Sequence, residues 1–213
     1  MRYERKYHIE RLGHATLEQL ILLHPAAFIE AWPSRRINNV YWDTPNWNSA
    51  RDNASGISAR TKVRVRWHGD DVEMLRQPVM EIKSKLNMQG RKKLIPLRDC
   101  TWQELPALVQ EQLEQELPNQ ALLPSLVNAY QRAYYVSMDG RFRLTVDHGM
   151  AYGSWLPWRF DAPVQDDASL VLELKYEADD DDAADEIARH LPMRVNKHSK
   201  YARGVALAYD LSF

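Results

Sequence analysis

The stretch from Arg60 to Trp67 alternates strictly between basic and other side chains, and this pattern constrains the fold more than any other feature. The even positions are Arg60, Lys62, Arg64 and Arg66, and the odd positions are Thr61, Val63, Val65 and Trp67. A period of two with β-branched and aromatic partners predicts a β-strand. Because the apolar side must be buried, four cations stand in a row on the opposite face.

The same alternation recurs in other parts of the chain. Residues 79–85, 141–147 and 170–176 each have an apolar and a charged side, and Glu4, Lys6 and His8 share a face at the N-terminus. Two arrangements are open to such strands. One is an open antiparallel sheet with a wet outer side. The other is a closed antiparallel barrel lined by the charged faces, with the apolar faces outward under covering helices. The wealth of Arg and Lys on the charged faces favours a site for a polyanion.

The balanced net charge hides a strong local segregation. With 28 Lys+Arg and 29 Asp+Glu the net charge is −1, so bulk attraction to nucleic acid or to an anionic membrane is not implied. Residues 60–98 nevertheless carry the basic residues Arg60, Lys62, Arg64, Arg66, Arg76, Lys83, Lys85, Arg91, Lys92, Lys93 and Arg98 against the acids Asp70, Asp71, Glu73 and Glu81. Such asymmetry indicates a local anion site on an otherwise neutral protein.

Several function classes are excluded by what the sequence lacks. With Cys100 as its single cysteine, the chain has no internal disulfide and no zinc site that needs two cysteines. No apolar run approaches the roughly 20 residues of a membrane span, and no apolar stretch follows the N-terminus, so we expect a cytoplasmic protein. There is no P-loop, no Rossmann fingerprint and no zinc-protease motif.

The helical segments are expected to cover the sheet. Helix signals follow Thr16 and Thr101, and a third helix is expected after the four aspartates Asp179–Asp182. Those aspartates favour a helix N-terminus, with a metal-binding cluster as the alternative. No linker or repeat divides the chain, and the sequence predicts one α+β domain over residues 1–213.

Nine short signatures follow one another along almost the whole chain. They are Glu4–Tyr7, Asn39–Thr44, Lys62–Arg66, Glu81–Lys85, Gly90–Lys93, Tyr130–Arg132, Arg143–Asp147, Glu173–Tyr176 and Ser199–Tyr201. In this order the chain resembles the VTC domain, the catalytic module of polyphosphate polymerases, within the triphosphate tunnel metalloenzyme (CYTH-like) superfamily. The resemblance implies a closed eight-stranded antiparallel barrel, a tunnel whose basic lining holds triphosphate or polyphosphate, with helices packed on its outside.

The resemblance also implies roles for particular residues. Catalytic roles fall to Lys6, Arg64, Arg66, Lys83, Arg132, Glu173 and Lys200. Phosphate binding falls to Arg91, Lys93 and Ser199, and the alternation adds Lys62, Arg143 and Lys175 on the charged faces. Glu173, with Glu4 or Glu81, would hold Mn²⁺ or Mg²⁺, and oxygen ligands suit these hard ions. Tyr130 is a candidate for stacking on a nucleotide base, with a core tyrosine as the alternative.

Two positions are less constrained. Arg91 and Lys93 alternate with Lys92, so the pair and Lys92 cannot share a face, and the family spacing favours the pair. In the first strand Arg2 stands where many hydrolytic tunnel enzymes have the first glutamate of Glu-x-Glu-x-Lys. The loss of that carboxylate favours transfer to a phosphate acceptor over hydrolysis.

Three hypotheses follow from the sequence. The first is a metal-dependent polyphosphate polymerase that moves the terminal phosphoryl group of ATP onto a growing chain. The second keeps the tunnel and uses water as acceptor, as an inorganic triphosphatase or nucleoside triphosphatase. The third is a non-catalytic polyphosphate- or nucleotide-binding module that passes a phosphate signal to a protein partner of unknown identity.

Overall fold

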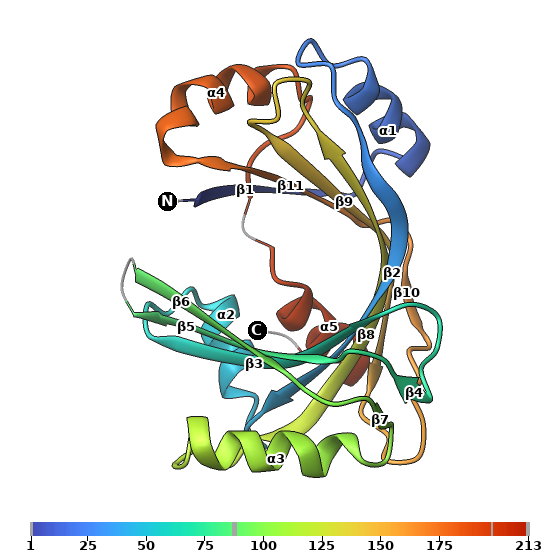
Figure 1. Cartoon of the computed structure of the whole chain (residues 1–213), viewed down its shortest axis with the longest axis vertical. Helices are drawn as coiled ribbons and strands as arrows, with labels where there is room; N and C mark the ends of the chain where they lie inside the picture. The colour runs from blue at the N-terminus through green and yellow to red at the C-terminus, as the bar shows by residue number, and fades with distance from the viewer. Residues whose placement is uncertain (1, 87–88, 197, 212–213) are drawn as a thin grey trace. The chain divides into compact units, whose positions relative to one another are not determined.

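The computed structural model describes residues 2–86, 89–196 and 198–211 (Figure 1). The strands are β1 (Arg2–Ile9), β2 (Ile29–Asp43), β3 (Arg60–His68), β4 (Met74–Leu75), β5 (Val79–Leu86), β6 (Gln89–Pro96), β7 (Cys100–Thr101), β8 (Leu123–Val136), β9 (Arg143–Ser154), β10 (Val164–Asp166) and β11 (Leu170–Glu177). The helices are α1 (His14–Leu22), α2 (Asn48–Ala54), α3 (Leu105–Glu116), α4 (Asp181–Arg189) and α5 (Lys200–Tyr209), with a 3₁₀ turn η1 (Ala178–Asp180).

The main sheet has the strand order β1-β11-β9-β8-β2-β3-β5-β6, with β10 added beside β9. The eight strands on this path are the eight that the sequence resemblance implies, and the pairings β1–β11, β11–β9, β2–β3, β3–β5 and β5–β6 are antiparallel. The mixed α+β class is therefore confirmed. Between the described residues no pairing joins β1 to β6, so closure of the barrel is not confirmed.

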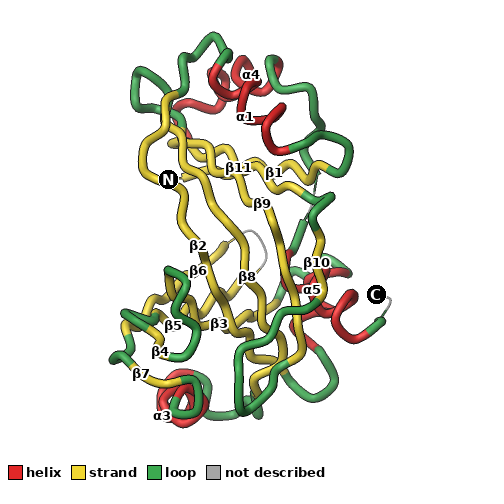
Figure 2. Tube along the Cα trace, turned by 90° about the vertical axis from the view of Figure 1, so that its right-hand side faces the viewer, coloured by secondary structure: helices red, strands yellow, loops and turns green. Residues whose placement is uncertain are grey.

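The chain forms two compact units. The first unit consists of Met1–Arg35, Tyr130–Met150 and Asp166–His198, and the second of Arg36–Ala129, Ala151–Gln165 and Ser199–Phe213. Strands β2, β8 and β9 contribute residues to both units (Figure 2). The prediction of a single domain stays a prediction.

In the first unit, the apolar faces of β1, β11 and β9 form a core with α1 and α4. Leu172 and Leu174 of β11 are fully buried against Leu17 of α1 and Ile187 of α4. The register of β1 and β11 keeps their faces matched, because Lys6 lies opposite Glu173 and Tyr7 lies opposite Leu172. Most polar residues of the two strands therefore gather on one face and most apolar ones on the other, with Arg5 opposite Leu174 and Val171 opposite His8 as exceptions.

In the second unit, the apolar faces of β3 and β5 pack against α3. Val63, Val65 and Trp67 are buried with Leu105 and Val109 of α3. These are the odd positions of the alternating segment, so the prediction of a strand with one buried face is confirmed. The basic positions of β3 lie on the face opposite α3.

Helix α5 packs on the charged face of the second unit, unlike α3. Its Tyr201 stacks on Tyr41 with ring centroids 4.6 Å apart and donates a hydrogen bond to Asp43 Oδ2 at 2.6 Å. Tyr41 pairs with Arg64 across β2 and β3, so both side chains share a face. Gly204 permits this close approach, since a Cβ there would lie 2.4 Å from Tyr152 Cδ1. The arrangement of α3 and α5 on opposite faces is visible in Figure 1.

The expected helix starts are confirmed in part. Helix α1 begins at His14 with Gly13 as N-cap and no side-chain cap, so the start expected at Thr16 is wrong by three residues. The Thr101 backbone N–H does donate to Glu104 Oε2 at 2.8 Å, but Glu104 is the N-cap of α3 and Thr101 lies in β7, so the expected N-cap at Thr101 is wrong. Asp181 and Asp182 lie in the first turn of α4, where the helix dipole favours negative charge.

The free edge of β1 is covered by a single side chain of the first unit. The Asn196 amide accepts the His8 backbone N–H at 2.7 Å and donates to the His8 carbonyl at 3.1 Å. The Asn196 backbone N–H also donates to the Lys6 carbonyl. These bonds satisfy backbone groups that an edge strand otherwise presents to other chains.

Within the described part of the chain, no helix combines the length and the apolar character needed to cross a bilayer.

Candidate functional site

The charged face of β1 and β11 carries a network of two lysines and two glutamates in the first unit. Lys6 Nζ lies 3.0 Å from Glu4 Oε1 and 3.0 Å from Glu173 Oε1. Lys175 Nζ lies 2.7 Å from Glu173 Oε2. The alternation of the two strands produces this network, because Glu4 pairs with Lys175 and Lys6 pairs with Glu173 in the register. Glu173 therefore sits between two ammonium groups.

Glu173 is the buried member of this network. The Glu173 side chain is only 8% exposed, whereas that of Glu4 is 39% exposed. Burial alone would lower the pKa of Lys6, but the carboxylates of Glu173 and Glu4 raise it well above its ordinary value. Lys6 is therefore a permanent cation, suited to holding a phosphate and unsuited to accepting a proton.

Arg132 of β8 extends the network through a buried carboxylate. Its guanidinium makes a two-pronged contact with Asp147, with Nε to Oδ1 at 2.5 Å and the second amino group to Oδ2 at 2.7 Å. Asp147 is fully buried and Arg132 is 11% exposed at the side chain. Burial by itself would lower the pKa of Arg132. The Asp147 carboxylate has the opposite effect, and the pKa of Arg132 lies well above its ordinary value. One Arg132 amino group also lies 3.9 Å from Glu173 Oε2, so Asp147 fixes its orientation beside that glutamate.

The residues around Glu173 offer part of a coordination shell for a hard divalent ion. Glu4 and Glu173 each place a carboxylate oxygen 3.0 Å from the Lys6 ammonium, so the two carboxylates lie around the same point. Thr145 pairs with Glu173 across β9 and β11, and its buried hydroxyl has no hydrogen-bond partner in the described protein. In the described part of the chain no group of three His, Cys, Asp or Glu side chains could hold a metal. Two carboxylates with phosphate and water oxygens fit Mg²⁺ or Mn²⁺, which keep several non-protein ligands.

In the second unit, Glu81 is the acid at the centre of a basic face. Arg64 donates to Glu81 Oε2 through Nε at 3.0 Å and through a terminal nitrogen at 2.6 Å. Arg66 and Lys92 each place a nitrogen 3.5 Å from the same carboxylate. Burial would raise the pKa of Glu81, but Arg64 and Arg66 hold it down at about 2. Glu81 therefore stays ionised and orients the cations, which favours a positioning role over the metal-ligand role expected from the resemblance.

The rest of this face is crowded with like charges. Across β3, β5 and β6 the register places Lys62 opposite Lys83 and Lys83 opposite Lys92, and Arg60 opposite Lys85. Like charges directly opposite each other destabilise a sheet. The face carries the bases Arg60, Lys62, Arg64, Arg66, Lys83, Lys85 and Lys92 with Glu81 as the acid that the register places among them. A bound polyanion would relieve this repulsion.

The register corrects the choice between Lys92 and its neighbours. Arg91 pairs with Ser84 and Lys93 pairs with Ile82, so both lie on the face opposite Lys83. Lys93 makes an ion pair there with Glu116 of α3 at 2.6 Å. Lys92 is the residue of this strand that reaches Glu81. The expected placement of Arg91 and Lys93 on the charged face is therefore wrong, and Lys92 takes their place.

The structure places the remaining expected site residues in different surroundings, some on a charged face and some at a helix end or in the core. Arg143 pairs with Lys175 and shares its charged face. Ser199 is the N-cap of α5, accepting from the Ala202 N–H at 3.4 Å, and Lys200 is the first residue of that helix. Tyr130 is 2% exposed, with the Arg132 guanidinium 5.4 Å from its ring centre. This burial favours the alternative of a core tyrosine over base stacking. The Arg2 side chain lies outside the described part of the chain.

Sequence reasoning missed two residues of the site, and each had a detectable signal. Asp147 lies at an alternating position of its strand, on the same charged face as Thr145, and strand pairing brings it to Arg132. Lys92 follows from the hairpin, because Leu86 pairs with Gln89 and the register from there leads to Lys83 opposite Lys92.

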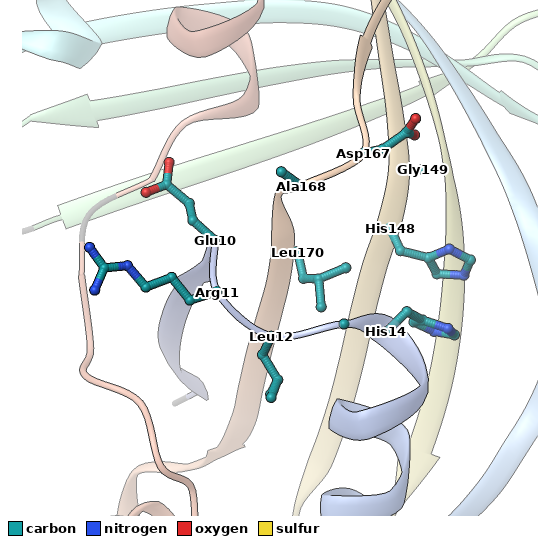
Figure 3. A pocket seen from close by; sticks show the side chains of 10 residues that line it. Glu10, Arg11, Leu12, His14, His148, Gly149, Asp167, Ala168 and Leu170 are labelled. Carbon is teal, nitrogen blue, oxygen red and sulfur yellow. The ribbon is translucent and has the colours of Figure 1, made fainter.

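A pocket of about 560 Å³ lies elsewhere in the first unit and contains none of these residues (Figure 3). Glu10 and Arg11 line one part of it, and His14 and His148 lie side by side at another. The two imidazole rings are 3.8 Å apart at their centres and tilted by 30°.

Comparison with solved structures shows a shared fold at low sequence identity. A putative adenylyl cyclase from Hippeastrum, described as having a dominant triphosphatase activity, matches with a TM-score of 0.53 and 15% identity over 98% of this chain and 97% of that chain. A putative adenylate cyclase from Bacillus halodurans matches with a TM-score of 0.57 and 14% identity over 95% and 96%. A conserved hypothetical protein from Pyrococcus furiosus matches with a TM-score of 0.52 and 12% identity over 95% and 99%.

No curated protein matches the sequence. The family model of the VTC domain matches residues 1–209, which is nearly the entire chain. The match has the extent that the nine ordered signatures indicate, and it agrees with the charged strand faces described above. The chain belongs to the VTC domain family.

Proposed function

We propose that this protein is a metal-dependent phosphotransferase that moves the terminal phosphoryl group of ATP onto a polyphosphate chain. Membership of the VTC domain family supports this reading. The single observation that carries it is the row Lys62, Lys83 and Lys92 on adjacent strands, where like charges face one another. Like charges opposite each other repel, and bound phosphates would offset that repulsion.

Each unit, taken by itself, offers part of the chemistry that this proposal needs. The basic face of the second unit binds phosphates through Arg64, Arg66, Lys62, Lys83 and Lys92. The network of the first unit combines cations with Glu173 and Glu4, which would hold Mg²⁺ or Mn²⁺. When bound, such an ion neutralises charge on phosphate oxygens. Lys200, Ser199, Arg143 and Lys175 stay in the proposal as phosphate ligands, and closure of the barrel stays a prediction.

The chain's own residues act by positioning and by neutralising charge. In the transfer step the terminal oxygen of polyphosphate attacks the γ-phosphorus of ATP, a new P–O bond forms, and the bond to the ADP oxygen breaks. Such in-line transfer depends on alignment more than on covalent catalysis. Arg132 is oriented by Asp147, and Lys6 is held by Glu4 and Glu173, so neither group has to reorganise when the charge develops.

The second candidate function is hydrolysis of triphosphate. It uses the same residues with water as acceptor, and the fold likeness to a protein described as having a dominant triphosphatase activity favours it.

The two candidate functions differ in their product. We expect ATP with Mn²⁺ to yield long polyphosphate on a gel, and orthophosphate release without chain product would assign the protein to the hydrolases. Tight, salt-sensitive tripolyphosphate binding without turnover in any metal would establish a binding module and contradict both.

Glu173→Gln tests the metal role of the first unit. Loss of this carboxylate should abolish metal-stimulated turnover, while metal-free tripolyphosphate binding persists or strengthens because one negative charge is removed. Glu111→Gln on the exposed side of α3 is the matched control and should retain activity. Full metal-dependent turnover in a folded Glu173→Gln protein would overturn the metal assignment.

A further inference from the structure

An exposed tryptophan, a tyrosine and an arginine form an aromatic surface in the first unit. Trp32 of β2 is 51% exposed, and its ring meets Tyr134 of β8 edge-on, with centroids 6.1 Å apart at 90°. The Arg35 guanidinium lies over the Tyr134 ring, 5.2 Å from its centre. Edge-to-face and cation–π geometries are favourable, so both contacts hold the Tyr134 ring in place.

This aromatic surface lies beside Arg132. Tyr134 is two residues beyond Arg132 on β8, which puts both on one face about 7 Å apart. The intervening Ala133 and the following Tyr135 instead belong to the hydrophobic core. Burial raises the pKa of Tyr134, and the positive charges of Arg132 and Arg35 oppose that rise, as expected for neighbours on one face.

Trp32 has the accessible ring that Tyr130 lacks. Tyr130 is 2% exposed beneath Arg132 and offers no face to a ligand. Trp32 keeps half of its surface in solvent while its orientation is set by Tyr134. Scattered surface tryptophans are common, but Trp32 is held by Tyr134, which shares a face with Arg132, and the proposed function assigns Arg132 to phosphate; nucleobase stacking needs such an arrangement.

We propose that Trp32 stacks against the nucleobase of a nucleoside triphosphate whose phosphates bind at Arg132. The inference rests on the proposed function and adds to it the residue that holds the base of the nucleotide. Stacking uses the π-face of the base and makes few hydrogen bonds, so the site accepts different bases. Inorganic tripolyphosphate has no base and gains nothing from Trp32.

Calorimetric binding of ATP and of tripolyphosphate, both without divalent metal, tests the role of Trp32. Trp32→Ala should weaken ATP binding about tenfold and leave tripolyphosphate binding unchanged, and Trp32→Phe should restore most of the ATP affinity. Trp158→Ala removes an exposed tryptophan of the second unit, 65% exposed, and should change neither affinity. The experiment measures binding and not turnover. It therefore tests the role of Trp32 even if the protein binds ATP without transferring phosphate.

Three outcomes would overturn the inference. They are unchanged ATP binding in folded Trp32→Ala, an equal loss for ATP and tripolyphosphate, and a loss in Trp158→Ala of the same size. If Trp32→Ala does not fold, the Phe variant decides through fluorescence. ATP should quench part of the wild-type tryptophan emission, and that part should be absent in Trp32→Phe. Equal quenching in both proteins would contradict stacking at Trp32.

Discussion

At the scale of single residues, Glu81 links the stability of the protein to pH. Its folded pKa of about 2 lies below the ordinary value, so it stabilises the fold above about pH 4.5 and loses this contribution as the pH falls toward 2. Glu81→Gln should therefore lower the free energy of unfolding at pH 7 by about 3 kcal/mol. Urea denaturation at pH 7 and pH 3 should show the difference from wild type shrinking at acid pH. A difference that does not change with pH would contradict this role.

Asp147 is the second residue whose charge decides stability. Asp147→Asn leaves the buried Arg132 guanidinium without its carboxylate partner. Breaking one side of a buried pair is strongly destabilising, and we expect a loss of about 3–5 kcal/mol. Chemical denaturation measures this loss. Arg141→Ala, which removes an exposed pair with Asp180, is the control and should cost less than about 1 kcal/mol.

At the scale of elements, the register of the β5–β6 hairpin separates two adjacent lysines. Lys92 contacts Glu81 on the basic face, whereas Lys93 contacts Glu116 of α3 on the other face. Lys92→Ala should weaken tripolyphosphate binding about fivefold, because one charged contact is lost. Lys93→Ala should leave binding unchanged. Isothermal titration of both variants at two salt concentrations tests this, and a larger effect from Lys93 would mean that the register is wrong.

Helix α5 depends on a glycine for its contact with the sheet. A Cβ at Gly204 would lie 2.4 Å from Tyr152 Cδ1 and 2.7 Å from Leu126 Cδ2. Gly204→Ala favours the helix by up to about 1 kcal/mol, but overpacking costs about 1–3 kcal/mol, so we expect net destabilisation. Thermal unfolding measures it. Gly13→Ala, where a Cβ meets nothing within 4 Å, is the control, and equal melting temperatures of the two variants would contradict tight packing of α5.

At the scale of the whole molecule, two hydrophobic cores are joined by continuous strands. Leu172 belongs to the core of the first unit and Val65 to that of the second, and β2, β8 and β9 run through both units. We expect one unfolding transition by calorimetry, because these strands share their hydrogen bonds. Leu172→Ala should lower the temperature of that transition by roughly 5–15 °C. Val65→Ala should lower the temperature of the same transition by less. Two resolved transitions, each shifted by one variant, would show that the units unfold independently.

The sequence by itself determined the strands with clear alternation, β1, β3, β5, β9 and β11, and the two faces of each. The alternation of Arg60 to Trp67, and of Glu4 to His8, is a local property, because successive side chains of a strand point to opposite sides whatever the strand pairs with. The nine ordered signatures also indicated the family that the comparison confirmed.

Tertiary structure alone decided which charged faces meet. Lys92 rather than Lys93 joins Glu81 because the hairpin register selects one of two alternating sets, and a shift by one residue would reverse the choice. Asp147 binds Arg132, and Tyr201 reaches Asp43 across 158 positions of sequence, because separate strands and α5 come together in the fold. Such contacts depend on the packing of distant elements, and no local period in the sequence encodes them.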